Sequence, residues 1–453
     1  MGKFFGTDGV RGEANRVLTA DLAYRLGRAA AHVLKEQSAA GANAMVIGKD
    51  TRISGDMLEA SLIAGICSAG VDVYKAGVIP TPAVAVLTRH LEALAGVVIS
   101  ASHNPYEDNG IKFFNPNGQK LSDSQELAIE ELLEGDLSQL PQPVGAELGR
   151  VHEYSEGAAY YTGFVKEKID GDFSGLKIVV DCANGAASKI APQILQDMGA
   201  EVMAIYHSPN GVNINDNCGS THLSALQHAV VEENADLGLA YDGDADRLQA
   251  VDHAGQVVDG DQLLAIFARY LKAEGQLAQD LMVATVMSNM GLKAALKSIG
   301  VAVAESQVGD RYVIEKMDET GAVLGGEKSG HIIFKQYNTT GDGIMSSMKL
   351  LEIVKKSQST LKELAAFMDK YPQVLINVPV ERKQGWQQEA AITEAIEQAQ
   401  AQLGEAGRIL VRASGTENLL RVMVEGQQEA EIALIAQQVA QVVDQTLGKG
   451  AQS

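Results

Sequence analysis

Two short runs of the sequence combine residue types that can perform chemistry together. Residues 102–105 read SHNP, so a serine stands beside a histidine directly after the apolar run 96–99. Residues 242–247 read DGDADR, and carboxylates at alternate positions can face one side of an extended segment. A serine hydroxyl can be phosphorylated, and carboxylate oxygens suit a hard divalent cation such as Mg²⁺. Taken together, the two runs predict phosphoryl transfer, which neither run would justify alone.

The surroundings of the first run predict that Ser102 lies on a loop between two strands. The apolar run 96–99 predicts a buried strand, and the following Asn-Pro pair prevents a helix from beginning there. His103 and Lys112 can then flank the serine as proton carriers or as cations. For an isolated SHNP, a plain turn would be the preferred interpretation. Ser100 also stays open as a rival nucleophile on the residues alone.

The acidic run differs from a calcium loop of the EF-hand type. Such a loop has glycine at its sixth position and glutamate at its twelfth, whereas the sixth residue here is Arg247. A solvated acidic turn is the alternative to a magnesium site. A further run, residues 412–421, concentrates positive charge in an acidic chain and predicts a phosphate cradle. Its candidate donors are Arg412, Ser414, Gly415, Thr416 and Arg421.

Five separated runs make the chain resemble the alpha-D-phosphohexomutases, and among them the branch that acts on glucosamine phosphates. In the family's order, these are residues 5–12, 98–105, 242–247, 326–331 and 412–421. The resemblance selects Ser102 over Ser100, because the family carries a phosphoserine at the second serine of this run. It implies one Mg²⁺ per chain, bound by the phosphate on Ser102 and by Asp242, Asp244 and Asp246.

The resemblance also implies roles for other residues. Residues 326–331 resemble a sugar-binding loop, in which Glu327 and Ser329 would bind hydroxyl groups. Arg311 would help to orient the substrate. The catalytic group would comprise Ser102, His103, Lys112, Arg11 and Arg247, with His103 or Lys112 as the general acid or base.

The implied reaction interconverts glucosamine 6-phosphate and glucosamine 1-phosphate. Phospho-Ser102 would pass its phosphoryl group to the free hydroxyl, giving glucosamine 1,6-bisphosphate, and would be rephosphorylated from the other end. Such a reaction supplies UDP-N-acetylglucosamine and peptidoglycan precursors. The alternatives are a phosphomannomutase or phosphoglucomutase, and a non-catalytic, metal-dependent sugar-phosphate binding protein.

Three similar stretches predict the elements that position these residues. Residues 44–52, 177–185 and 281–289 each read as a buried strand that ends in a polar or glycine turn. A helical stretch closed by glycine and a new strand follow each of them, which predicts βαβ units in mainly parallel or mixed sheets. We therefore expect an α/β fold with three related α/β domains and a smaller α+β C-terminal domain. The resemblance places them around a central cleft.

Composition and junction residues predict four domains. The chain has 453 residues, too many for one core. Pro141 and Pro143, the turn at Gly255 and the Tyr371-Pro372 pair mark the junctions. The predicted ranges are 1–153 for the phosphoserine-bearing domain, 154–255 for the magnesium-binding domain, 256–370 for the sugar-binding domain and 371–453 for the phosphate-binding domain.

Charge and cysteine content narrow the class of partner. A net charge of −21 argues against nucleic acid and against anionic membranes. The three cysteines are scattered, so neither a disulfide framework nor a zinc site is expected. No signal-peptide pattern is seen, which predicts a cytoplasmic protein. The expected partners are small-molecule hexosamine phosphates, and the resemblance suggests a homodimer.

Overall fold

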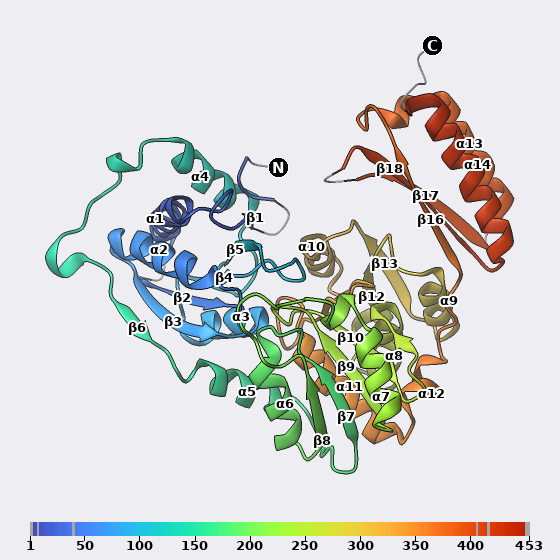
Figure 1. Cartoon of the computed structure of the whole chain (residues 1–453), viewed down its shortest axis with the longest axis horizontal. Coiled ribbons are helices and arrows are strands. Elements are labelled where there is room, and N and C mark those ends of the chain that lie inside the picture. The colour runs from blue at the N-terminus through green and yellow to red at the C-terminus, as the bar shows by residue number, and fades with distance from the viewer. Residues whose placement is uncertain (1–2, 7–8, 39–40, 405, 415–416, 449–453) are drawn as a thin grey trace. The chain divides into compact units, whose positions relative to one another are not determined.

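The computed structural model describes residues 3–6, 9–38, 41–404, 406–414 and 417–448 (Figure 1). The chain divides into two compact units. The first comprises residues 1–288 and 299–367, and the second comprises residues 289–298 and 368–453. Each unit is described by itself below.

The first sheet of the larger unit is six-stranded, with the order β1-β5-β4-β2-β3-β6. Its strands are β1 (Val10–Glu13), β2 (Ala44–Lys49), β3 (Asp72–Val78), β4 (Ala95–Ile99), β5 (Asp108–Phe114) and β6 (Val151–Glu153). Its helices are α1 (Ala20–Gln37), α2 (Gly55–Ser68), α3 (Thr81–His90) and α4 (Asp123–Glu134).

Alternation along β2 separates the two faces of this sheet. Met45 and Ile47 pack into a core with α1 and α2. Gly48 faces the other way, toward α3, where a Cβ would lie 2.6 Å from Cγ2 of Val84. The glycine therefore lets α3 pack directly on the strand. Helices thus cover both faces, which explains why β2 and β4 are almost continuously apolar.

The second and third sheets have five and four strands, ordered β11-β10-β9-β7-β8 and β13-β12-β14-β15. The second contains β7 (Lys177–Asp181), β8 (Glu201–Ile205), β9 (Leu237–Tyr241), β10 (Leu248–Asp252) and β11 (Val257–Val258), with α5 (Gly157–Glu167), α6 (Ala187–Asp197) and α7 (Ser224–Glu232). The third contains β12 (Leu281–Thr285), β13 (Ala302–Ser306), β14 (Leu324–Gly326) and β15 (Ile332–Phe334), with α8 (Gly260–Ala273), α10 (Asp310–Thr320), α11 (Gly343–Ser357) and α12 (Leu361–Ala365).

All three sheets share one strand order. The series β3-β2-β4-β5, β8-β7-β9-β10 and β13-β12-β14-β15 each contain three parallel strands followed by an antiparallel one. The prediction of three related α/β domains with mixed sheets is therefore confirmed. The four residue ranges given to the domains stay a prediction.

Helix α11 follows the third sheet in sequence but packs against the second domain. It contacts β10, α5 and α6 as well as α8. Asp342 caps its N-terminus and also accepts a 2.7 Å hydrogen bond from the hydroxyl of Tyr161. Tyr241 donates to Ser347 at 2.7 Å. Both tyrosines are fully buried, so this helix completes the core beneath the second sheet.

The smaller unit has a different architecture. Its sheet is antiparallel in the order β16-β18-β17, formed by β16 (Gln373–Pro379), β17 (Gly407–Ala413) and β18 (Leu419–Gly426). Helices α13 (Ala390–Leu403) and α14 (Glu429–Leu447) lie side by side along it (Figure 1), and α9 (Met290–Ser298) belongs to the same unit. Ile392, Val422 and Ile435 belong to its apolar core. The predicted α+β C-terminal domain without the repeat is confirmed.

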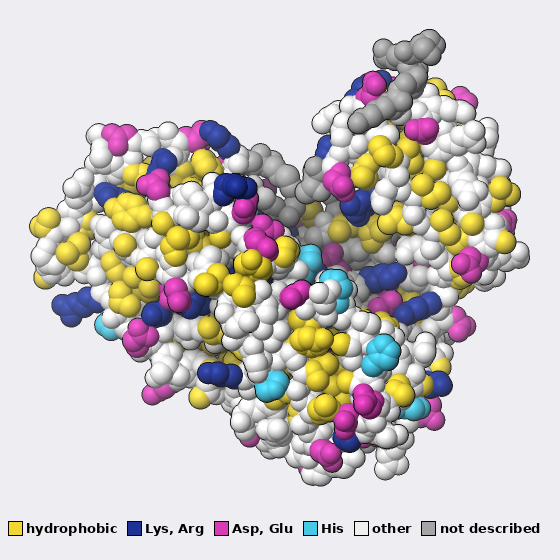
Figure 2. All heavy atoms as spheres, viewed as in Figure 1, with side chains coloured by type: hydrophobic (Ala, Val, Ile, Leu, Met, Phe, Trp, Pro, Cys, Tyr) yellow, Lys and Arg dark blue, Asp and Glu magenta, His cyan; other side chains and the backbone are white. Residues whose placement is uncertain are grey.

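Surface and membrane properties can be stated for the described residues. On the face that Figure 2 shows, lysine and arginine side chains lie interspersed with acidic ones. Within the described ranges, no helix combines the length and the apolar character that crossing a membrane requires.

Candidate active site

In each α/β domain, one of the predicted runs lies in the turn that joins the third strand of the shared series to its antiparallel fourth strand. Residues 100–107 join β4 to β5, residues 242–247 join β9 to β10, and residues 327–331 join β14 to β15. The turns also contact one another. Ser102 donates to Asp242, and the amide of Leu248 donates to the carbonyl of Gly330 at 3.0 Å. One topological position, repeated three times, therefore builds one site.

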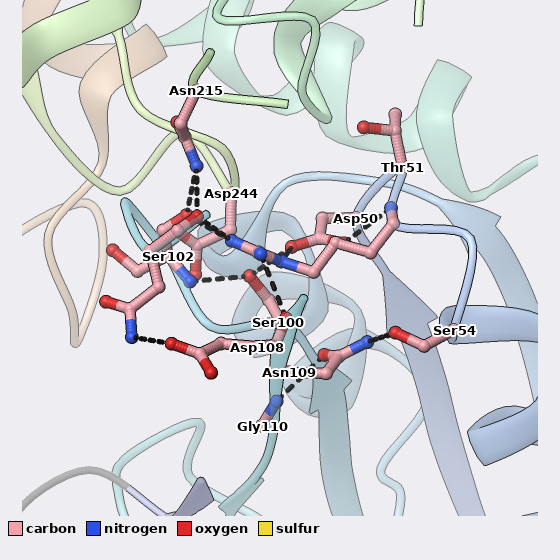
Figure 3. Close-up of polar contacts among 12 residues, drawn as sticks. Asp50, Thr51, Ser54, Ser100, Ser102, Asp108, Asn109, Gly110, Asn215 and Asp244 are labelled. Carbon is pink, nitrogen blue, oxygen red and sulfur yellow. Dashed lines mark hydrogen bonds and ion pairs between the residues drawn. The ribbon is translucent and has the colours of Figure 1, made fainter. Parts of the chain in front are cut away.

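Ser102 points at the acidic turn. Its side chain is 1% exposed, and its Oγ donates to Oδ2 of Asp242 at 2.6 Å. Nδ1 of His103 lies 3.4 Å from the same Oγ. Ser100 is fully buried, and its hydroxyl donates to Asp50 at 2.6 Å (Figure 3). The geometry thus favours Ser102 over Ser100 as the residue that exchanges a phosphoryl group.

Asp242, Asp244 and Asp246 form a buried group that could hold a metal ion. One carboxylate oxygen from each lies within 4.8 Å of the others. Oδ2 of Asp244 accepts hydrogen bonds from Thr81 at 2.6 Å and Lys112 at 3.1 Å. Oδ1 of Asp244 and Oδ1 of Asp246 are buried without a hydrogen-bond partner. Buried carboxylate oxygens in that condition fit a cation with oxygen ligands.

The charges of the acidic turn are unevenly compensated. Burial, and then the charges of Asp246 and Asp244, raise the pKa of Asp242 well above its ordinary value. Burial opposes ionisation of Asp246 too, but the hydrogen bond and charge of His331, with Lys112 and Arg247, hold its pKa below the usual range. Asp242 is thus the least compensated carboxylate of the turn, and a divalent cation bound there would favour its ionised form.

Three predicted basic groups lie beside the acidic turn. Lys112 extends from β5 to Asp244, and Nε of Arg247 lies 3.9 Å from Asp242 and 3.8 Å from Asp246. Burial, together with the charges of Arg247 and Arg11, lowers the pKa of His103 to about 4. His103 is therefore neutral at pH 7.

A cavity of about 370 Å³ opens beside Ser102. Its wall includes Arg11, Arg247 and Glu327, so it joins the first domain to the turn 327–331 of the third. Oε1 of Glu327 accepts a hydrogen bond from the amide of Gly309 at 3.0 Å, which orients the carboxylate. Oγ of Ser329 is buried without a hydrogen-bond partner in the structure.

Arg311 has a different environment from the other predicted substrate residues. Its guanidinium pairs with Asp123 of α4 and, at 2.7 Å, with Glu315. Hydrogen bonds to these carboxylates, Asp123 first, raise the pKa of Arg311 above its ordinary range. In the structure, the guanidinium of Arg311 is therefore paired with two acidic side chains.

The cradle residues lie in the smaller unit. Arg412 on β17 stands directly opposite Arg421 on β18. Burial, and then the charge of Arg421, lower the pKa of Arg412. Like charges at such a cross-strand pair repel, so an anion between them would relieve the repulsion. Ser414 lies at the end of β17 and is buried, whereas the predicted donors Gly415 and Thr416 lie outside the described residues.

Two contributors to the site were missed at the sequence level. Thr81, at the start of α3, binds Asp244 through both its amide and its hydroxyl. Asn215 donates to the carbonyls of Ser102 and Asn104 at 2.8 and 3.0 Å (Figure 3). The only signal for Asn215 is the asparagine-rich segment 210–217 between β8 and α7, and neither residue follows a periodic pattern.

Comparison with protein families covers nearly the whole chain. Four domain descriptions of the phosphoglucomutase/phosphomannomutase family match in order. Alpha/beta/alpha domain I matches residues 2–139, domain II residues 158–255, domain III residues 259–371 and the C-terminal domain residues 375–442.

Individual relatives agree with this result. The chain is 57% identical to the phosphoglucosamine mutase of Desulforamulus reducens, over 98% of this chain and 99% of that one. It is 50% identical to that of Geobacillus thermodenitrificans, over 99% and 100%. Among solved structures, a family member from Burkholderia thailandensis superimposes with a TM-score of 0.80 at 23% identity, covering 97% of this chain and 96% of that one. The N-acetylphosphoglucosamine mutase of Aspergillus fumigatus, in complex with GlcNAc-6P and magnesium, gives 0.68 at 19% identity over 97% and 96%.

Proposed function

Because the chain belongs to the phosphoglucomutase/phosphomannomutase family, and within it to the phosphoglucosamine mutases, which are isomerases, we propose that it interconverts glucosamine 6-phosphate and glucosamine 1-phosphate. The observation that carries this proposal is the position of Ser102, whose hydroxyl faces three buried carboxylates beside a cavity lined by Glu327. A nucleophile, a cation site and a sugar-binding turn are therefore adjacent.

In the proposed reaction, phospho-Ser102 first donates its phosphoryl group to the free hydroxyl of the monophosphate. The bond between phosphorus and the serine oxygen breaks, and a bond from phosphorus to the sugar oxygen forms, which gives the 1,6-bisphosphate. The sugar then reverses in the site. Ser102 takes the other phosphoryl group, so the isomeric monophosphate leaves and the enzyme is again phosphorylated.

The basic residues would have separate tasks. Nδ1 of His103 lies 3.4 Å from Oγ of Ser102, so its geometry favours proton transfer to or from the reacting hydroxyl. Lys112 contacts Asp244, with Asp246 at 3.9 Å, and is better placed to balance charge. Arg11 and Arg247 line the cavity and would bind the phosphoryl oxygens.

The acidic turn would hold one Mg²⁺ through Asp242, Asp244, Asp246 and the phosphate on Ser102. When bound, the ion would offset the negative charge on the transferred group. The unpartnered oxygens of Asp244 and Asp246 support this assignment.

The remaining sites would recognise the substrate. Glu327 and Ser329 would bind sugar hydroxyls, while Arg412, Ser414, Gly415, Thr416 and Arg421 would bind the phosphate that is not reacting. Arg311 would orient the substrate only after exchanging one of its carboxylate partners.

Two measurements test the proposal. Intact-mass analysis and phosphopeptide mapping of the purified protein should find phosphate on Ser102. Turnover of glucosamine, glucose and mannose 6-phosphates should be highest for the glucosamine compound. A protein without phosphate on Ser102 and without isomerase activity would be the sugar-phosphate binding protein instead. Highest turnover of mannose or glucose phosphate would reassign the substrate.

A further inference from the structure

We propose that Arg52 and Asn215 are positioning residues that hold the Ser102 turn in the geometry required for phosphoryl transfer. Neither side chain contacts Oγ of Ser102, so neither is a catalytic residue. Both instead bind backbone carbonyls of residues 102–108, and Figure 3 shows Asn215 pointing at the Ser102 turn. The inference rests on the proposed function of Ser102 and adds the means by which its turn is held.

Arg52 binds three carbonyls of the Ser102 turn and that of Asp108, the first residue of β5. Nη2 donates to the carbonyls of Ser102 and Asn104 at 2.9 and 2.8 Å. Nη1 donates to Asp108 at 3.0 Å and also to Pro105. Because the guanidinium is planar and its donors are fixed, these bonds determine where the turn lies relative to the end of β2.

Asp50 and Ser100 fix the other side of this arrangement. Asp50 is 1% exposed, and its Oδ2 accepts from Nε of Arg52 at 2.9 Å and from the hydroxyl of Ser100 at 2.6 Å. Oγ of Ser100 in turn accepts from the amide of Ser102 at 2.9 Å. The amide of Ser102 is therefore linked through Ser100, and its carbonyl through Arg52, to the single buried carboxylate of Asp50.

Asn215 ties the same turn to the second domain. Its Nδ2 donates to the carbonyls of Ser102 and Asn104, the two that Nη2 of Arg52 also binds. Gly243 of the acidic turn packs against this point, where a Cβ would lie 2.5 Å from the carbonyl oxygen of Ser102. The two carbonyls thus lie between Arg52 of the first domain and Asn215 of the second, and the acidic turn packs against the carbonyl of Ser102.

The backbone of Ser102 explains why such support is needed. Its φ is 52°, a left-handed conformation that is unfavourable for residues other than glycine. A conformation of this kind persists only where its surroundings determine it. In this conformation Oγ faces Asp242, so loss of the supporting bonds would let the turn relax and move the nucleophile. Phosphoryl transfer depends on in-line positioning, and an error of about 1 Å can cost about 100-fold in rate.

The test compares Asn215→Ala and Arg52→Lys with two controls. Asn213→Ala changes the same segment, but the Asn213 side chain donates to Ser208 rather than to the Ser102 turn. Arg89→Lys changes another partly buried arginine, one that binds Tyr337 and Asn338. The measurements are kcat and KM for glucosamine 6-phosphate, melting temperature, and the ³¹P resonance of phospho-Ser102 after loading with glucosamine 1,6-bisphosphate.

We expect kcat of Asn215→Ala to fall about 30- to 100-fold, with KM within about twofold of wild type. The kcat of Arg52→Lys should fall further than that of Asn215→Ala if the variant folds. If Arg52→Lys does not fold, the result for Asn215→Ala alone decides the test. Both variants should take up phosphate, but their ³¹P resonance should shift or broaden. The controls should keep the kcat and the resonance of wild type, even where the melting temperature falls.

Two outcomes would overturn this inference but leave the proposed function intact. In the first, Asn215→Ala has the kcat and the ³¹P resonance of wild type. In the second, the loss of kcat follows the loss of melting temperature in the variants and the controls alike. A wild-type protein that never carries phosphate on Ser102 has a different meaning. It would overturn the proposed function, and this inference with it.

Discussion

The Ser102 turn and the acidic turn occupy the same position in two related domains but differ in how their polar groups are satisfied. The backbone of the Ser102 turn accepts hydrogen bonds from Arg52 and Asn215. In the acidic turn, Asp244 and Asp246 each keep a buried oxygen without a hydrogen-bond partner. One turn is complete in the protein alone, whereas the other has room for a cation. A shared scaffold thus supplies position, and the residues of each turn supply its chemistry.

The largest expected effect comes from removing the nucleophile Ser102 itself, compared with removing its neighbour Ser100. Ser102→Ala should lower turnover at least about 1,000-fold even with 1,6-bisphosphate present, because no residue remains to accept the phosphoryl group. A coupled isomerase assay and intact-mass analysis check this. Ser100→Ala should still take up phosphate. Stoichiometric phosphate on Ser102→Ala would show that another residue carries it.

The next prediction concerns the incomplete turn. Asp242→Asn removes one of three mutually repelling carboxylates, so without metal it should raise the melting temperature relative to wild type. With Mg²⁺ the order should reverse, and metal affinity should fall about 10- to 100-fold. Thermal denaturation in chelator and in Mg²⁺ measures both effects. Full wild-type turnover in excess chelator would contradict a metal-dependent role for this turn.

The third equivalent turn extends the comparison to the sugar. Glu327→Ala should lower kcat/KM for glucosamine 6-phosphate about 10- to 100-fold. The reason is that the variant lacks the carboxylate that would accept a hydrogen bond from a sugar hydroxyl, so the site no longer recognises that hydroxyl. Phosphate content at Ser102 should stay unchanged. Lys328→Ala, one residue away, is the matched control and should retain kcat/KM. Unchanged kinetics for Glu327→Ala would remove this turn from substrate binding.

An effect on binding of similar size is expected in the domain that lacks the repeated turn. Arg412→Ala should weaken binding of glucosamine 1-phosphate and 6-phosphate alike, by about 1.5–3 kcal/mol for a charge-assisted hydrogen bond. Without ligand it should be slightly stabilising, by about 0.2–1 kcal/mol, because the facing Arg421 loses a like-charged neighbour. Titration with each isomer and thermal denaturation check the two parts. Weaker binding of one isomer only would exclude a shared phosphate anchor.

The repeated strands and the charged turns could be predicted because both leave local patterns. Buried strands such as 177–181 are continuous apolar runs, and the carboxylates of 242–246 alternate. Contacts between distant segments leave no such pattern. Arg311 binds Asp123 across 188 residues, and Asn215 reaches Ser102 across 113. Such pairs depend on how whole elements pack, which no short window of sequence encodes.

Helix α11 has a consequence for how the chain is made. It closes the core of the second domain, yet Ser347 follows its partner Tyr241 by 106 residues. At about 5–20 residues per second, synthesis leaves the apolar face beneath β9 and β10 without this helix for several seconds. Nascent chains that end before residue 343 should therefore need a chaperone to stay unaggregated. The second domain can first reach its final protease resistance once residue 357 has left the ribosome.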